Sequence, residues 1–190
     1  MADLGAVSVW IALALASYSA IGSVLGKVRS VPVLVLSSQR AVYLVVLAVL
    51  VATLSLVALF ISRDFEVAYV ALHSELAMPD RFTWVAFYAG YEGSLLFIAF
   101  ALAVMSALAI WRAPQRLLDT MPYTTAILMV ILAFFLAVMG FMANPFDKLA
   151  VIPPDGQGIN PLLIHLGMFF HPPALMAGLV ATAIPLAFSM

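Results

Sequence analysis

Residues 144–173 read NPFDKLAVIPPDGQGINPLLIHLGMFFHPP. This stretch is the longest interruption between the apolar runs of the chain. It holds two of the three histidines, six of the eleven prolines and three of the ten glycines. Proline and glycine clusters disfavour regular helix, so we expect an irregular loop here. Because ionisable ring nitrogens are concentrated in the same loop, we expect it to carry the chemistry of the protein.

On both sides of this loop the sequence is strongly apolar. Of the 190 residues, 66% are hydrophobic and 9% are charged, with a mean hydropathy of +1.17, whereas soluble domains carry about 25% charged residues. These values indicate an integral membrane protein. The net charge is −1 and the eight basic residues are scattered, which excludes a nucleic-acid-binding surface. The absence of cysteine excludes a disulfide framework, a thiolate metal site and a cysteine nucleophile.

Five apolar runs are each able to cross a hydrocarbon core of about 30 Å as a helix. In lipid the backbone must satisfy its own hydrogen bonds, so each run is predicted to be helical even where Val and Leu dominate. The fold class is therefore all-α, a polytopic helical bundle that forms one membrane domain over residues 1–190. The predicted spans are residues 5–26, 41–62, 84–111, 123–143 and 172–190, with loops 63–83 and 144–171 on one side of the membrane.

The connectors predict the orientation of the bundle. Five basic residues follow the first and third spans and three lie on the other side: Lys27, Arg29, Arg40, Arg112 and Arg116 against Arg63, Arg81 and Lys148. Because Lys and Arg favour the cytoplasmic side, the N-terminus and both long loops are expected outside the cytoplasm. Residues 32–40 are too short to cross and are predicted to lie at the interface or to fold back. The first run lacks the basic start of a cleaved signal and the last lacks a basic anchor, so we expect a retained first helix and the front part of a longer chain.

His171 directly precedes Pro172 and Pro173 at the start of the last apolar run. Proline suits the first turn of a helix, where N–H groups lack partners anyway, so His171 is expected at the outer mouth of the fifth span. The partial positive charge of a helix N-terminus disfavours a protonated imidazole. The neutral ring keeps the lone pair that a metal or haem iron needs. The alternative is an interfacial histidine that caps the helix and binds water.

The other two histidines are interpreted as structural. His165 lies six residues before His171 in an otherwise apolar stretch, which places it on a different face if the stretch is helical. Two ligands to one iron from this pair are therefore not expected. His73 lies in a charged loop and is expected to be solvated.

Glu92 lies inside the predicted span 84–111, where an ionised carboxylate costs at least about 2.5 kcal/mol. Intramembrane acids face a cavity or a partner, or are protonated. Gly90 and Gly93 leave room on that face for another helix or a flat ligand, so we expect Glu92 to make a functional or interhelical contact. The alternative is a shallow position from which the side chain reaches the surface.

Four stretches carry a family resemblance. They are FEVAYVA at 65–71, AGYEGSLL at 89–96, ANPFDKL at 143–149 and GQGINPLLIHLGMFFHPPALMAG at 156–178. In order and spacing they are similar to the CcmF-type cytochrome c haem lyases of the cytochrome c maturation system, and they cover most of the chain after residue 60. The resemblance implies a multi-pass protein of the bacterial inner (cytoplasmic) membrane, with its functional loops on the periplasmic side.

Members of this family receive haem from a periplasmic haem chaperone and attach its vinyl groups to the two thiols of a CxxCH motif in apocytochrome c. Their HPP histidine is one of two periplasmic axial ligands, and it corresponds to His171. The resemblance implies that haem b is handled as substrate, that His171 binds its iron, and that Pro172, Pro173, Glu92 and Asn160 contribute to the cofactor site. No catalytic residue is assigned. The implied partners are the remaining part of the lyase, the haem chaperone, apocytochrome c with its thiol-reducing and chaperone subunits, and the lipid membrane.

The sequence departs from the family pattern in two places. Residues 88–94 read YAGYEGS where the family usually has WGGHEGS, so Tyr91 replaces a histidine, and residues 164–167 read IHLG where QDPG is common. The tryptophan-rich haem-binding segment, the second periplasmic histidine and the intramembrane haem-b histidines lie later in the family's chain. We therefore expect a fragment, a split-gene subunit or a degenerate relative, which is not active alone. The alternative function is a non-catalytic membrane scaffold or transporter component that retains the fold.

Overall fold

The computed structural model describes residues 1–114, 117 and 119–189. Within these residues every regular element is a helix, and the one β-type pairing is an isolated bridge between Val67 and Lys148. The α-helices are α1 (Ala2–Val28), α2 (Pro32–Ile61), α3 (Ala68–His73), α4 (Thr83–Phe87), α5 (Tyr91–Trp111), α6 (Met121–Met142), α7 (His171–Ala181) and α8 (Ala183–Ser189). The described residues also include the short 3-10 helices η1 (Asp80–Phe82), η3 (Pro161–Leu163) and η4 (Leu166–Phe169).

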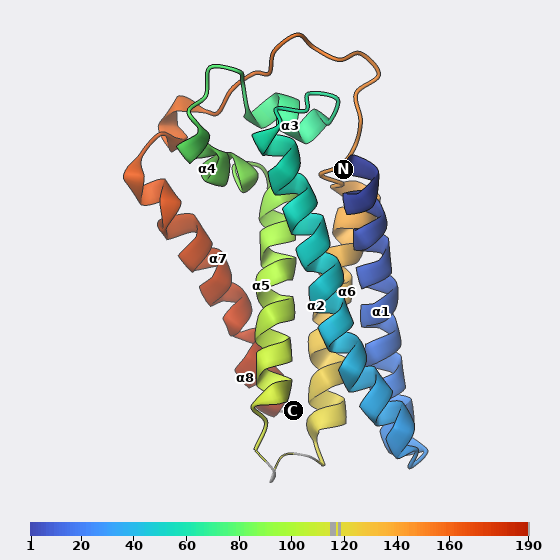
Figure 1. Cartoon of the computed structure of the whole chain (residues 1–190). Helices are drawn as coiled ribbons and strands as arrows, with labels where there is room; N and C mark the ends of the chain where they lie inside the picture. The colour runs from blue at the N-terminus through green and yellow to red at the C-terminus, as the bar shows by residue number, and fades with distance from the viewer. Residues whose placement is uncertain (115–116, 118, 190) are drawn as a thin grey trace.

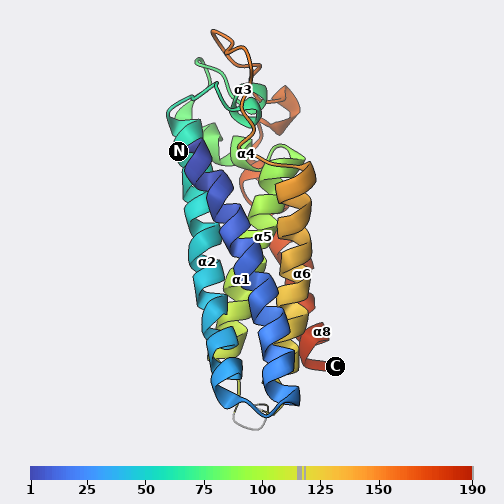
Figure 2. The same cartoon turned by 90° about the vertical axis from the view of Figure 1, so that its right-hand side faces the viewer.

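In the described part of the chain, five helical segments are long and apolar enough to cross a membrane. They are α1, α2, α5, α6 and the segment Leu166–Ser189, which contains η4, α7 and α8. The first four lie side by side, while α7 packs on α5 and α8 packs on α6 (Figures 1 and 2). The predicted all-α, multi-pass membrane bundle is therefore confirmed.

The two ends of the bundle differ in structure. The loop end carries α3, α4 and residues 143–170, and the turn end carries the α1–α2 turn, the end of α5 and the start of α6 (Figure 1). The N-terminus lies at the loop end, and α8 ends near the turn end. Two predicted features, Arg116 in the basic connector and Met190 at the end of the last span, lie outside the described residues.

Small residues of α1 face the interior of the bundle. Ala12, Ala16 and Ser19 are fully buried, whereas Ile11 and Ile21 are exposed on the other side of the helix. Helices in lipid gain little from the hydrophobic effect when they associate, so close approach of small residues supplies much of their attraction. The sequence of α1 therefore suits a helix that is packed on one face and bathed in lipid on the other.

Residues 32–40, which were predicted to lie at the interface or to fold back, instead form the first turns of α2. Pro32 occupies the first turn of the helix, where its missing N–H group leaves no bond unmade. The helix then packs closely on α1, because Gly26 lets Val35 approach: a Cβ there would lie 2.8 Å from the Val35 Cγ2 atom. Ser19 Oγ also donates to the Ser38 carbonyl at 2.7 Å. Tertiary packing thus extends α2 beyond the predicted span.

Two other predicted spans are interrupted. The helix over residues 84–111 breaks at Tyr88–Gly90, between α4 and α5. The helix over residues 172–190 begins at His171 and breaks at Thr182, between α7 and α8. Pro185 lies shortly after the second break, and its ring removes a backbone donor and crowds the preceding turn. Because of the first break, Glu92 lies in the first turn of α5 rather than deep inside a helix.

Candidate functional site at the loop end

Two segments about 80 residues apart join to form the base of the loop end. The Ala68 N–H group donates to the Asp147 carbonyl, and the Leu149 N–H group donates to the Glu66 carbonyl, both at 2.8 Å. The segments belong to FEVAYVA and ANPFDKL, two of the stretches that carry the family resemblance. Their role in this structure is to pair with each other and so to fix the entrance to the long loop.

The same base is tied to the start of α1. The Phe146 ring is buried against Gly5, where a Cβ would overlap it. Lys148 Nζ lies 3.1 Å from Asp3 and 3.3 Å from Glu66. Hydrogen bonds from the ammonium to these two carboxylates raise the pKa of Lys148, so it stays charged. Because these groups are exposed, the pairs orient the segment more than they stabilise it.

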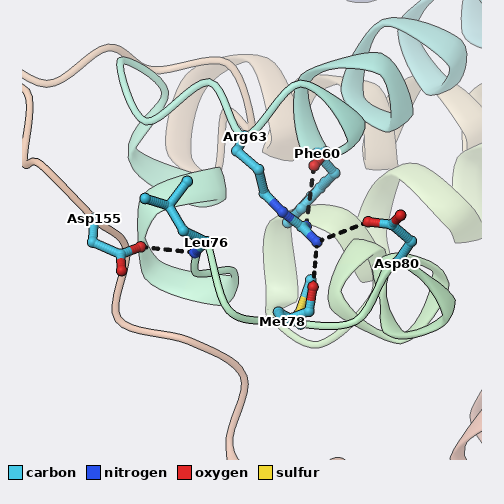
Figure 3. Close-up of polar contacts among 6 residues, drawn as sticks. All are labelled: Phe60, Arg63, Leu76, Met78, Asp80 and Asp155. Atoms are coloured by element: carbon cyan, nitrogen blue, oxygen red, sulfur yellow. Dashed lines mark hydrogen bonds and ion pairs between the residues drawn. The ribbon is translucent and has the colours of Figure 1, made fainter.

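Arg63 joins the end of α2 to the loop before η1. Its guanidinium donates to the Phe60 carbonyl at 3.2 Å and to the Met78 carbonyl at 2.7 Å, and it lies 3.4 Å from the Asp80 carboxylate (Figure 3). The planar fork of arginine can reach all three acceptors at once. These contacts hold the 78–82 segment close to α2.

The middle of the long loop lies on α3. Gln157 N–H donates to the Ala71 carbonyl at 2.8 Å, and Gly158 N–H donates to the Ser74 carbonyl at 3.1 Å. The Asp155 carboxylate accepts from Leu76 N–H at 2.8 Å (Figure 3). The end of a helix leaves carbonyl groups without partners, and the loop supplies donors to two of them. Residues 155–158 therefore cap α3.

Tyr69 fills the space that Gly90 and Gly93 leave open. Its hydroxyl donates to the Phe87 carbonyl and accepts from Gly90 N–H, each at 3.0 Å. A Cβ at Gly93 would overlap both the Phe87 carbonyl and this hydroxyl. The glycines thus accommodate a tyrosine of the same chain, and the expected room for another helix or a flat ligand is already occupied. Burial raises the pKa of Tyr69, which keeps the hydroxyl neutral.

Glu92 follows this contact in the first turn of α5. One carboxylate oxygen, Oε2, is buried and has no hydrogen-bond partner among the described residues. A negative side chain is favourable at a helix N-terminus, which compensates in part for the missing partner. Glu92 thus lies close to one end of α5, but one of its carboxylate oxygens does not reach the surface.

The segment that leads into α7 is held from two sides. The Tyr88 hydroxyl donates to the Met168 carbonyl, and the rings of Phe82 and Phe169 lie 5.7 Å apart. Burial raises the pKa of Tyr88 to about 12, so its hydroxyl remains a donor at neutral pH. The replacement of the family's tryptophan by Tyr88 thus comes with a direct hydrogen bond to η4. This bond positions the turn that ends just before His171.

His171 is the first residue of α7, and its side chain is exposed. Pro172 and Pro173 follow in the first turn and are half-buried. Among the described residues neither ring nitrogen of His171 takes part in a hydrogen bond, so both are available. Large apolar side chains are exposed nearby in sequence: Leu166 is 79% exposed and Phe170 is 78% exposed. This end of α7 offers an imidazole beside an open apolar surface.

The other predicted site residues have local roles. Asn160 Oδ1 accepts from Leu162 N–H at 3.0 Å and caps η3. His165 Nδ1 accepts from Gly167 N–H at 3.0 Å and caps η4. An Nδ1 atom that accepts requires the proton of a neutral ring to be on Nε2, which leaves no free lone pair for a metal. His165 is therefore less suited to bind iron than His171 in this conformation.

His73 is not solvated as expected but half-buried. Its Nδ1 atom lies 2.9 Å from the Tyr69 carbonyl and must donate there, and its ring packs 4.4 Å from the Tyr69 ring. The neutral ring then keeps its lone pair on Nε2. His73 lines a cavity of about 500 Å³ together with Gln157 and Asn160. Sequence reasoning missed this placement, since only the spacing from Tyr69 to His73, one helical turn, hinted at it.

No group of three or more His, Asp or Glu side chains converges to hold a metal ion within the part of the chain that the structure describes. A metal bound through a single histidine must therefore bring most of its own ligands. A haem iron does so, because the porphyrin supplies four nitrogens.

The chain is similar in sequence to proteins of one known family. Residues 88–190 match the model of one family, described as cytochrome C assembly protein. The chain belongs to this family. Over its whole length it is 32% identical to the cytochrome c-type biogenesis protein CcmF of Escherichia coli (strain K12). Over 99% of its length it is 31% identical to the cytochrome c-type biogenesis protein NrfE of Haemophilus influenzae.

A solved structure shares the fold. It is described as cytochrome c haem lyase CcmF, and it matches with a TM-score of 0.82 and 26% identity over 98% of this chain. The chain spans 29% of that structure, 30% of CcmF of E. coli and 30% of NrfE of H. influenzae. This cytochrome c assembly protein therefore corresponds to less than a third of the length of these relatives.

Proposed function

We propose that this chain is an N-terminal part or a split subunit of a cytochrome c haem lyase, in which His171 is one axial ligand to the iron of haem b. The observation that carries the proposal is the coincidence of two facts. The chain is similar to CcmF of E. coli along its whole length, and the HPP histidine is the exposed first residue of α7.

The surroundings of His171 support the binding of a porphyrin. Leu166, Phe170 and Leu175 expose apolar surface before and after it, which suits a flat apolar ring. An iron ligand needs a ring nitrogen that is not engaged elsewhere, and no hydrogen bond occupies His171 among the described residues. Pro172 and Pro173 fix the backbone of this turn, so little conformational freedom is lost on binding. We include Asn160 and Glu92 in the proposed site: Asn160 caps the turn that leads toward His171, and Glu92 has an unpaired buried oxygen.

In this proposal haem is the substrate, and its vinyl groups accept the two thiols of a CxxCH motif to form thioethers. His171 would hold the iron and so orient the ring for apocytochrome c. Tyr88 and Phe82 would keep η4, and with it the start of α7, in place. The second axial ligand and the intramembrane haem site would come from the remaining part of the lyase. A periplasmic haem chaperone would deliver the haem, and thiol-reducing and chaperone subunits would present the apocytochrome.

We further propose that the protein lies in the bacterial inner membrane with the loop end in the periplasm. The basic residues support this orientation, since four of them lie at the turn end: Arg29 and Arg112 directly follow α1 and α5, Lys27 is in the last turn of α1, and Arg40 is in the first turns of α2. Fusion of a periplasmic or a cytoplasmic reporter after Asp155 and after Pro114 tests it. We expect a periplasmic signal at Asp155 and a cytoplasmic signal at Pro114. The reverse pattern would rule out both the orientation and periplasmic haem binding by His171.

Substitution of single histidines in the assembled system tests the iron ligand. We expect His171→Ala to abolish covalent cytochrome c and to change the absorption spectrum of trapped haem. The matched variant His165→Ala should stay near wild type, because the Nδ1 atom of His165 is engaged in capping η4. His73→Ala serves as a second control. Loss of maturation in His165→Ala, with His171→Ala near wild type, would show the assignment to be wrong.

The alternative function is a non-catalytic scaffold or transporter component, and it is favoured by the replacement of the family's histidine by Tyr91. Affinity purification of the chain from its native membrane separates the two. A co-purified second polypeptide with bound haem supports the lyase subunit, and a stable haem-free oligomer supports the scaffold. The isolated 190-residue chain is expected to form no covalent cytochrome c from haem chaperone and apocytochrome, because it offers one axial ligand at most.

A further inference from the structure

We propose that a cavity at the turn end, between the α1–α2 turn and the start of α6, binds the phosphate headgroup of an anionic phospholipid. The cavity has a volume of about 440 Å³. Its lining includes Lys27, Ser30, Val35, Leu36 and Gln39 from the α1–α2 region and Pro122 from α6. This site is separate from the loop end, and the inference does not depend on the proposed function.

The cavity lies at the depth where lipid headgroups lie. The 30 residues of α2 span about 45 Å, close to the thickness of a bilayer with its headgroup layers. Lys27 lines the cavity, and Arg40 directly follows the lining residue Gln39 in α2; both are basic residues next to long apolar runs. The cavity therefore opens at the boundary between the hydrocarbon core and water, on whichever side of the membrane the turn end lies.

The lining is amphipathic in the way that a phospholipid requires. Lys27, Ser30 and Gln39 supply an ammonium, a hydroxyl and an amide, all able to donate to phosphate oxygens. Val35 and Leu36 supply the apolar wall. A free phosphate ion would use the donors but would gain nothing from the apolar side. A lipid uses both.

Exposed apolar side chains that could contact the acyl chains continue from the cavity along α2. Leu36, Tyr43 and Leu47 lie on one side of the helix at spacings of seven and four residues, and they are 49%, 43% and 55% exposed. Their exposed surface begins at the cavity and runs toward the middle of the bundle. A lipid whose phosphate sits near Lys27 can thus lay its tails on α2.

The charge at this end favours an anionic headgroup. Among the described residues of the turn end, four are basic (Lys27, Arg29, Arg40 and Arg112) and one, Asp119, is acidic. Lys27 Nζ lies 3.3 Å from Asp119, but that carboxylate is fully exposed and holds the ammonium weakly. Lys27 therefore keeps donors for a phosphate, and the surplus positive charge attracts one.

The geometry of the turn keeps the cavity open. Ser30 has a left-handed backbone with φ of 54°, and Val31 N–H donates to the Gly26 carbonyl at 2.8 Å while Ser30 N–H donates to the Lys27 carbonyl at 3.2 Å. These two bonds close the end of α1 in a Schellman motif. The tight closure fixes Lys27 and Ser30 relative to Val35, so the site exists before any ligand binds.

Native mass spectrometry of the purified, delipidated 190-residue chain tests the proposal, with phosphatidylglycerol as the probe and phosphatidylcholine of the same acyl chains as the neutral comparison. We expect tighter binding of phosphatidylglycerol. One lysine near an anionic lipid is worth about 1 kcal/mol, so Lys27→Gln should weaken this binding about fivefold. Leu36→Trp, at a half-exposed position, should also weaken it by filling the cavity.

Lys148→Gln is the matched control. Its side chain is as exposed as that of Lys27, 40% against 36%, and it also pairs with carboxylates, but it lies at the loop end. It should leave lipid binding unchanged. Equal binding of the two lipids, or an equal effect of the two lysine variants, would overturn the proposal. Displacement of the lipid by millimolar inorganic phosphate or glycerol 3-phosphate would also overturn it, since the ligand would then be a free phosphate.

Discussion

Replacement of Gly93 by alanine is expected to destabilise the protein strongly, although alanine is the better helix former. The added Cβ would overlap the Phe87 carbonyl and the Tyr69 hydroxyl, and it would lie 2.9 Å from the Tyr69 Cζ atom. The backbone carbonyl cannot move without opening the junction of α4 and α5. The tyrosine must therefore shift and give up its two hydrogen bonds of 3.0 Å.

The magnitude follows from three contributions. Overpacking of a filled site costs about 1–3 kcal/mol. Buried polar groups left without partners cost about 1–3 kcal/mol more. The higher helix propensity of alanine returns about 1 kcal/mol. The net loss is about 3 kcal/mol, which for a chain of this size lowers the melting temperature by roughly 6–12 °C.

Thermal unfolding of the purified protein in detergent, followed by circular dichroism, measures this loss. Gly178→Ala in α7 is the matched control, because no atom lies within 4 Å of the Cβ it would add. That variant should be neutral or more stable by up to about 1 kcal/mol. If Gly93→Ala melts at the wild-type temperature, or if both variants shift alike, the packing of Tyr69 into this gap is wrong.

Three further predictions concern the loop end. Tyr69→Phe should lower stability by about 2 kcal/mol, because the Phe87 carbonyl and the Gly90 N–H group lose a buried partner. The control Tyr43→Phe, at an exposed position of α2, should have no effect in the same melting experiment. Arg63→Lys should lower stability by about 1–2 kcal/mol, since a single ammonium cannot reach the Phe60 and Met78 carbonyls together. Added salt should leave this loss unchanged, because most of the acceptors are uncharged backbone carbonyls. In alkali the unfolded chain loses the Tyr88 proton from pH 10 upward, whereas the folded chain holds it to about pH 12, so the free energy of unfolding should fall across this range. The fall should be less steep in Tyr88→Phe. Equal pH profiles of the two proteins would contradict the burial of this hydroxyl.

Only part of the candidate site could be predicted from the sequence. The position of His171 at a helix start was predictable, because the proline pair that follows it is a local signal for the first turn. The placement of His73 was not, because its charged neighbours in sequence are not its neighbours in space. Its ring packs against the Tyr69 ring at an angle of 40°, and it lines a cavity with residues of the long loop, far later in the chain. The capping of η4 by His165 was also not predictable, because no residue pattern indicates the 3-10 helix at this place.

The sequence by itself determined that this chain is an all-α membrane protein. Length and hydropathy are enough for that, since lipid leaves the backbone no alternative to the helix. Its motifs were also enough to indicate the cytochrome c assembly family. Only the tertiary structure decided where the helices start and stop. The connector at Pro32 became helix because Gly26 lets Val35 pack against α1, and the span through Gly90 broke because the Tyr69 hydroxyl bonds to backbone groups there. Both outcomes rest on contacts between residues far apart in the chain, which local propensity does not contain.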